Sequence, residues 1–173
     1  MIARTLLTAV AALGLAGGAW AQAGARPDLN GTWVLNVARS DYGDFPGPNA
    51  QTLNIRQDGA ALHIGVAATV RRSTRSYDLD LPLDGQEVRF PLSADIRVGT
   101  TILRSASANW RGEALVVTET VQHMQEMTVL ETVYTRSPDG RSLSLRTNPK
   151  GEDVQSTLVF ERAGGEGRDP RRW

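Results

Sequence analysis

The sequence predicts an all-β protein, an antiparallel up-and-down barrel of about 8–10 strands. Short runs in which apolar and polar residues alternate recur from Leu29 onward, with no convincing helical period between them. Turn residues separate the runs, and their Asp-Gly and Pro-Asp-Gly pieces favour hairpins. A Gly-x-Trp motif, Gly31-Thr32-Trp33, opens the first run. Many short strands joined by turns are typical of a closed sheet, because closure removes exposed strand edges.

Residues 1–21 have the composition of a secretory signal. A basic start is followed by an apolar run, and Ala19-Trp20-Ala21 fits the small-residue cleavage pattern. The apolar run from Thr5 to Gly18 is shorter than the roughly 18 residues that a membrane span needs. We therefore expect a periplasmic or secreted bacterial protein with no membrane span after signal removal. The expected divisions are a signal at 1–21, a linker at 22–28, a barrel domain at 29–162 and a disordered tail at 163–173.

The composition excludes several classes of function. The 173 residues include 19 basic and 19 acidic side chains and no cysteine. A balanced charge creates no long-range field that would recruit nucleic acid, so we expect no nucleic-acid partner. Without cysteine the chain has no disulfide, no thiolate metal site and no cysteine nucleophile.

The first half of the barrel domain divides into alternating runs with turns between them. Asp58-Gly59 and Asp84-Gly85 are the clearest turn signals. The Gly- and Pro-rich segment 38–49 is expected to form a loop across one barrel end, with Tyr42 and Phe45 as lid residues. The expected strands are 32–37, 51–57, 62–70, 71–81 and a short one that contains Val88 and Phe90.

The second half continues the same pattern. Its connections carry Gly or Pro, which set the backbone angles that turns require. The expected strands are 100–110, 114–124, 127–136, 142–147 and 154–162.

The chain resembles the lipocalin-like branch of the calycin superfamily, and in particular small exported bacterial proteins. The resemblance rests on Leu29-Asn30-Gly31-Thr32-Trp33-Val34-Leu35-Asn36 and on later pieces such as Trp110-Arg111-Gly112-Glu113 and Leu158-Val159-Phe160-Glu161-Arg162. It implies that Trp33 points into the closed barrel end and that a late basic residue packs across its indole. Arg162 matches that position, and Arg146 is the competing partner. Stacking of a guanidinium on an indole contributes roughly 0.5–2 kcal/mol.

Two glutamates interrupt apolar series and are candidate ligand contacts. Glu119 stands among Leu115, Val117 and Val121, and Glu131 stands among Met127, Val129 and Val133. An inward carboxylate would hold a ligand's polar end or act as a general base. The alternative, which the pattern favours, is that the opposite faces are interior and both glutamates are solvated. The remaining candidate ligand-binding residues are aromatic side chains that could line the cavity or its rim: Tyr77, Phe90, Trp110 and Tyr134.

The sequence contains no motif for catalysis, cofactor binding or metal binding. The two histidines, His63 and His123, stand alone, and no nucleophile elbow or phosphate-binding glycine loop is present. We therefore expect no metal, no cofactor and no enzymatic activity. The resemblance implies a barrel that binds a small apolar or amphiphilic ligand. The alternatives are an envelope protein-interaction module with a filled barrel, whose protein partner is unknown, and a small hydrolase- or isomerase-like enzyme.

Overall fold

The computed structural model describes residues 26–43, 47–94, 96–98 and 101–164. The predicted signal at 1–21 lies outside the described residues, as do 22–25 of the predicted linker and 165–173 of the predicted tail. Among the described residues, no helix is long and apolar enough to cross a membrane.

The described residues form one antiparallel sheet with nine long strands, two strands of two residues each, and two short 3-10 helices. This confirms the predicted all-β barrel of about 8–10 strands. The elements are β1 (Gly31–Leu35), η1 (Val37–Arg39), β2 (Ala50–Asp58), β3 (Ala61–Val70), β4 (Ser73–Pro82), β5 (Val88–Arg89), η2 (Leu92–Ala94), β6 (Arg97–Val98), β7 (Thr101–Arg111), β8 (Ala114–His123), β9 (Glu126–Arg136), β10 (Ser142–Pro149) and β11 (Ser156–Arg162).

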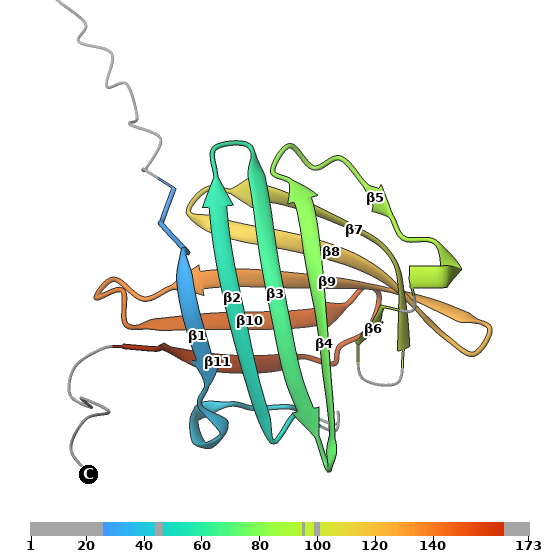
Figure 1. The fold of residues 1–173 in the computed structure, drawn as a ribbon, viewed down its shortest axis with the longest axis horizontal. Coiled ribbons are helices and arrows are strands. Elements are labelled where there is room, and N and C mark those ends of the chain that lie inside the picture. The colour runs from blue at the N-terminus through green and yellow to red at the C-terminus, as the bar shows by residue number, and fades with distance from the viewer. Residues whose placement is uncertain (1–25, 44–46, 95, 99–100, 165–173) are drawn as a thin grey trace, which may run out of the picture.

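The sheet curls until its two ends nearly meet. Its strand order is β4-β3-β2-β1-β11-β10-β9-β8-β7-β5, with β6 also paired to β7. Figure 1 shows the early strands β1–β4 crossing in front of the later strands β7–β10. Among the described residues, no strand forms a ladder with the edge of β4 that faces away from β3. One isolated bridge, Asp84 with Asn109, and a 2.9 Å bond from the Gly85 amide to the Ala108 carbonyl join the two sides. The barrel is therefore closed everywhere except along β4.

Two turns differ from the prediction because they use residues other than glycine. Arg71 and Met124 have positive φ values of 59° and 53°. The sequence analysis placed both residues inside strands, because side chains rarely adopt this left-handed conformation. In the structure β3 ends at Val70 and β8 ends at His123, so each pair of strands is joined by a two-residue turn.

The loop between β1 and β2 is more ordered than its Gly and Pro content suggests. It begins with η1, and Asp41 then pairs with Thr157 through bonds of 2.8 and 2.6 Å. The Tyr42 hydroxyl donates to the Pro48 carbonyl at 2.9 Å. Phe45, the second predicted lid residue, lies outside the described residues. The loop therefore follows β11 at the barrel end where β1 stops and β2 starts.

The opposite barrel end is closed around Trp33. The indole is fully buried, and its Nε1 donates to the Leu29 carbonyl at 2.9 Å. The Arg162 guanidinium lies over the ring, 5.2 Å from its centroid, and donates to the Asn30 carbonyl. Gly31 has a φ of +132°, and a Cβ at this position would lie 3.2 Å from Arg162 Nε. The glycine of the Gly-x-Trp motif therefore leaves room for the arginine that covers the tryptophan.

Part of the predicted linker belongs to this closed end. Arg26 lies over the Trp110 ring at 5.9 Å, and Leu29, the first residue of the predicted barrel domain, has no exposed surface. Trp110 lies on the inner face opposite Leu115, beside this end of the core. Arg146, the alternative partner of Trp33, is exposed and lies opposite Val133 on the outer face.

Replacing Arg162 should weaken the barrel more than replacing a matched arginine. Arg162→Ala removes both the stacking on Trp33 and the bond to Asn30, and we expect a loss of about 1–3 kcal/mol in the free energy of unfolding. Arg146→Ala, on the exposed outer face, should change it by less than about 0.5 kcal/mol. Urea unfolding followed by tryptophan fluorescence measures both. Equal losses in the two variants would show that Arg162 does not hold the closed end.

Candidate functional site

The pairing register determines which face of each strand looks into the barrel. Leu115, Val117 and Glu119 on β8 lie opposite Tyr134, Thr132 and Leu130 on β9. Leu115 and Val117 belong to the buried core, so the face of β8 that carries Glu119 points inward. The sequence analysis favoured two solvated glutamates. For Glu119 that interpretation is wrong.

Glu131 is the second glutamate, and the structure removes it from the candidate ligand contacts. It pairs with Thr118 on the outer face of the β8–β9 hairpin. The Arg111 guanidinium donates to its two carboxylate oxygens at 3.1 Å each. Both side chains are largely exposed, so this ion pair adds little to stability. Glu131 shares this outer face of β9 with the apolar residues Met127, Val129 and Val133, so apolar neighbours in the sequence do not mark an inward position here.

The barrel interior has a filled half and an accessible half. Around Trp33 most inward side chains have almost no exposed surface, and Trp110 is the partly buried residue at this end. Toward the other end, several inward side chains that pack against the core are only partly buried. Solvent therefore reaches the interior from the side away from Trp33. The filled half contains Leu29, Trp33, Leu53, Leu62, Leu81, Leu115, Leu143 and Phe160. The partly buried set includes Ala68, Tyr77, Val88, Phe90, Ile96, Leu130 and Leu158.

Glu119 lies at the accessible part of this interior. Its cross-strand neighbours are Ala106 on β7 and Leu130 on β9, and neither can bond to a carboxylate. Protein surrounds the side chain, yet part of it remains accessible to water, as expected for a group that lines an internal space. Burial raises the pKa of Glu119 to about 7, because desolvation disfavours the charged form. No hydrogen bond from another described side chain offsets that cost.

Two phenols share the environment of Glu119. Tyr77 comes from β4, and Tyr134 comes from β9. Burial raises the pKa of each phenol, and the nearby Glu119 carboxylate raises it further. Tyr134 is almost fully buried, whereas Tyr77 keeps some accessible surface. Glu119, Tyr77 and Tyr134 thus form one polar cluster, the Glu119 cluster, in an otherwise apolar interior.

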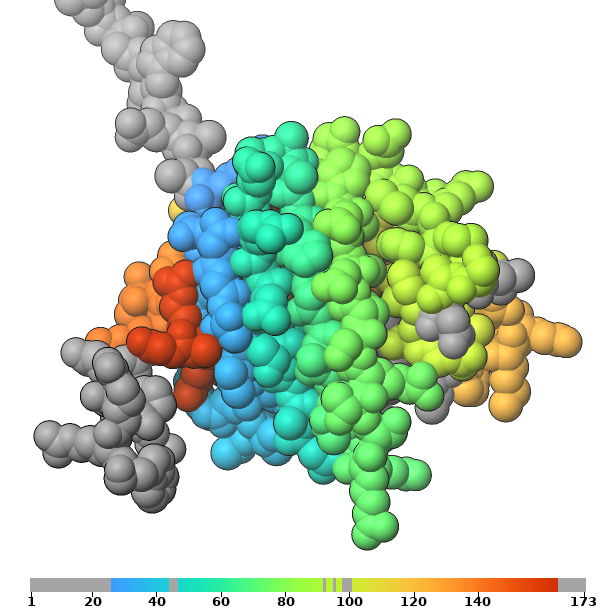
Figure 2. Space-filling view, viewed as in Figure 1, coloured from blue at the N-terminus to red at the C-terminus, as the bar shows by residue number. Residues whose placement is uncertain are grey.

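A groove beside β4 is lined in part by Tyr77 of the Glu119 cluster. It has a volume of about 380 Å³ and lies between β4 and the segment from η2 to β6. Figure 2 shows side chains of the β5–β7 region lying beside those of β4 on this face. Tyr77 and Ile96 line the groove and also pack against the core, so the groove borders the barrel interior at these two residues. The lining residues are Arg75, Ser76, Tyr77, Asp78, Ala94, Ile96 and Arg97.

Arg104 is a residue whose setting the sequence analysis missed. In the structure it is the extra residue where the β7–β8 register shifts between Leu103 and Ser105, and its carbonyl accepts from the Phe90 amide at 2.9 Å. Its Nη1 is buried and has no hydrogen-bond partner among the described residues. No turn or composition signal marks this bulge in the sequence.

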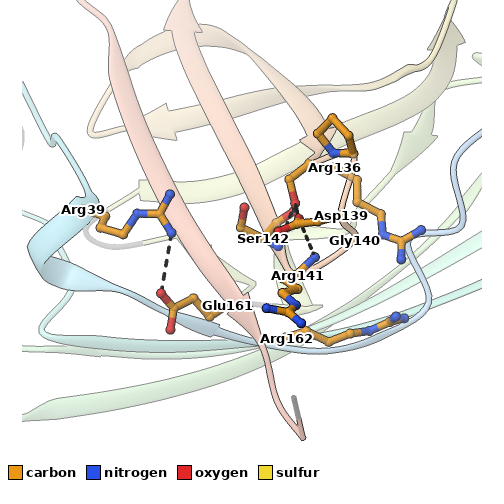
Figure 3. A pocket seen from close by; sticks show the side chains of 10 residues that line it. Arg39, Arg136, Asp139, Gly140, Arg141, Ser142, Glu161 and Arg162 are labelled. Carbon is orange, nitrogen blue, oxygen red and sulfur yellow. Dashed lines mark hydrogen bonds and ion pairs between the residues drawn. The ribbon is translucent and has the colours of Figure 1, made fainter. Parts of the chain in front are cut away.

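A second depression, of about 930 Å³, lies outside the barrel at the β9–β10 turn. Figure 3 shows four arginines around it together with Asp139 and Glu161. Both carboxylates already have partners. Asp139 accepts from the Ser137 hydroxyl and the Arg141 amide, and Glu161 accepts from Asn36 at 2.7 Å and pairs with Arg39 at 3.6 Å. This surface therefore stabilises its own turn and is separate from the interior.

The predicted site residues thus fall into three groups. Tyr77, Glu119 and Tyr134 come together, and Phe90 lies with them among the partly buried inward residues. Trp110 lies apart, at the closed end beneath Arg26. Glu131 is on the outer face.

His63, expected to stand alone, contacts Asp80 at 2.8 Å and Asp78 at 3.5 Å on the outer face. The described residues contain no group of side chains suited to hold a metal ion.

The raised pKa of Glu119 should appear in the pH dependence of stability. Between its ordinary pKa of 4.5 and about 7, the folded protein keeps a proton that the unfolded chain has lost. The free energy of unfolding should therefore fall as pH rises through this window. In Glu119→Gln that fall should be smaller by about 1–3 kcal/mol. Urea unfolding at pH 5 and pH 8 measures it, with Glu131→Gln as the control. A fall that is equally steep in wild type and Glu119→Gln would contradict the assignment.

The fold is similar to several solved structures of low sequence identity. A secretory abundant heat soluble protein from Ramazzottius varieornatus has a TM-score of 0.58 and 15% identity, over 78% of this chain and 95% of that chain. Human cRBP IV has a TM-score of 0.53 and 19% identity, over 79% and 99%. Fatty-acid-binding protein 1 from Echinococcus granulosus has a TM-score of 0.52 and 12% identity, over 78% and 97%.

Sequence comparison adds no closer relative, because no protein-family model and no curated protein matches the chain. At these identities the structural likenesses concern the fold alone. They agree with the strand order and the nearly closed sheet described above. The antiparallel barrel predicted from the sequence is therefore confirmed, and its fold is similar to the folds of these proteins.

Proposed function

We propose that the protein binds a small amphiphilic ligand in the accessible half of its barrel. The observation that carries this proposal is the change in burial along the inner face, from a filled half around Trp33 to partly buried side chains near Leu130 and Leu158. Concave sites that bind small molecules are mostly apolar, with a few polar groups that orient the ligand. The apolar inner residues and the Glu119 cluster supply that combination.

The ligand enters through the groove beside β4. Among the described residues no ladder runs along this side of β4, so the strands can separate there with the loss of few backbone hydrogen bonds, those near Asp84 and Gly85. Tyr77 lies at the junction of groove and interior. The name of the similar Echinococcus protein states that it binds fatty acids, which supports an apolar ligand in a barrel of this shape.

The proposal describes an exported carrier without enzymatic activity. Export rests on the predicted signal at 1–21, and the mature protein would reside in the periplasm or outside the cell. The absence of catalysis rests on the site itself. Glu119 has no histidine or serine among its described cross-strand partners, which supports a binding role over a hydrolytic pair of the serine–histidine kind.

Two adjacent alanines on β3 provide a matched test of where the ligand lies. Ala68 points inward at the accessible half, and Ala67 pairs with Thr52 and Ser76 on the outer face. Ala68→Trp should fill the ligand space and weaken binding of the neutral dye Nile red about tenfold or more. Ala67→Trp should leave binding nearly unchanged. Fluorescence titration of each folded variant measures the affinity.

The outcome of that test separates a carrier from a filled barrel. Binding that depends on the residue at position 68 and not on that at position 67 supports the interior site. If Nile red fails to bind the unmodified protein, and native mass spectrometry of the protein from its own host shows no retained small molecule, the carrier proposal is wrong. The accessible half would then serve another role, such as contact with a protein partner.

A further inference from the structure

Glu119 stands without a counter-charge on the inner face of the barrel. The other acidic residue on this face of the β8–β9 hairpin, Glu126 opposite His123, is exposed at the turn, so Glu119 is the acidic residue that this face carries into the interior. The flanking inward residues Val117 and Val121 are apolar, as are its cross-strand neighbours on β7 and β9. A carboxyl group in such surroundings gains from any hydrogen-bond donor that reaches it, because burial has removed its water.

The other titratable and charged groups near the site do not neutralise Glu119. Tyr77 on β4 and Tyr134 on β9 are phenols and carry no charge at neutral pH. Arg104 at the bulge is the nearest cation along β7, the strand that pairs with β8, and Arg75, which lies opposite Ala68, and Arg97 line the groove. Burial is the cause that raises the pKa of Glu119, and no arginine acts against it. A ligand end that reaches the cluster therefore meets an uncompensated acid.

From this arrangement we infer that the Glu119 cluster selects amphiphiles whose polar end donates a hydrogen bond, a hydroxyl or an ammonium, over amphiphiles that end in a carboxylate. This inference rests on the proposed function. An ammonium forms a charge-assisted bond with ionised Glu119, and a hydroxyl donates to it while accepting from a phenol. A carboxylate end would place two like charges together at low dielectric, which disfavours binding once Glu119 ionises.

Three probes with the same ten-carbon chain test the selection: 1-decylamine, 1-decanol and decanoate. Each displaces Nile red from the folded protein at pH 6 and at pH 8.5. At pH 8.5 we expect decylamine to bind about tenfold or more tightly than decanoate. Between pH 6 and pH 8.5 the ratio of decylamine affinity to decanoate affinity should rise, because Glu119 loses its proton in this interval. Decanol should change least with pH.

Substitutions test whether Glu119 causes the preference for decylamine over decanoate. In Glu119→Gln the affinity ratio between decylamine and decanoate at pH 8.5 should fall to near one. The outer-face control Glu131→Gln should keep the wild-type ratio. The ratio is taken within each variant, so a change in the affinity for the dye does not affect it. If Glu119→Gln does not fold, the rise of the ratio with pH in the unmodified protein tests the same point.

The outcomes separate the selection from the carrier proposal. If all three probes displace the dye with equal affinity, the barrel is a carrier, and the inferred preference for hydrogen-bond donors over carboxylates is wrong. A preference for decanoate that disappears in Arg104→Gln would also overturn it, because the buried Nη1 of Arg104 would then hold the polar end. If none of the probes displaces the dye and Ala68→Trp has no effect on it, the proposed function itself fails.

Discussion

The pairing of the first strand with the last is the constraint on which the rest of the barrel depends. β1 and β11 are antiparallel neighbours, and their register places Trp33 directly opposite Arg162. All the other neighbouring long strands in the sheet follow one another along the chain. The pairing of β1 with β11 therefore turns a linear meander into a nearly closed sheet. Arg162 then covers the indole and bonds to Asn30, so the same residue that ends the sheet also closes the barrel end. Most side chains at that end are fully buried, and most of the partly buried inward residues lie in the far half.

The strands and the general shape could be predicted from the sequence because alternation with a period of two depends on local residues. Leu62, Ile64 and Val66 share one face of their strand, because side chains two residues apart in a strand point the same way regardless of distant contacts. The closed end was expected from the resemblance, which implies that Trp33 points into it and that a late basic residue covers its indole. The turns at Arg71 and Met124 could not be predicted, because the strands that they connect impose the left-handed backbone conformation there.

Which glutamate points inward depended on the length of one turn. With a two-residue turn at Met124, Glu119 lies opposite Leu130, so Glu119 and Glu131 must occupy different faces. The sequence carries no Gly or Pro at this turn, and both faces of β9 contain apolar residues. A shift of one residue in register would have exchanged the faces. The position of Arg104 was beyond prediction for a similar reason, since a bulge changes the register within a single strand.

The Glu119 cluster links the stability of the empty barrel to the chemistry of its ligand. An uncompensated carboxyl in an apolar interior lowers the stability of the ligand-free fold at neutral pH, whereas a residue such as Leu would avoid that cost. The filled half around Trp33 can tolerate this penalty because it supplies a continuous buried core. A ligand that donates to Glu119 removes the penalty when it binds, so part of the binding free energy comes from relief of a cost already present in the protein. A ligand without a donor obtains no such gain. An unfavourable side chain inside the barrel is thus a source of specificity, which apolar contacts alone supply weakly.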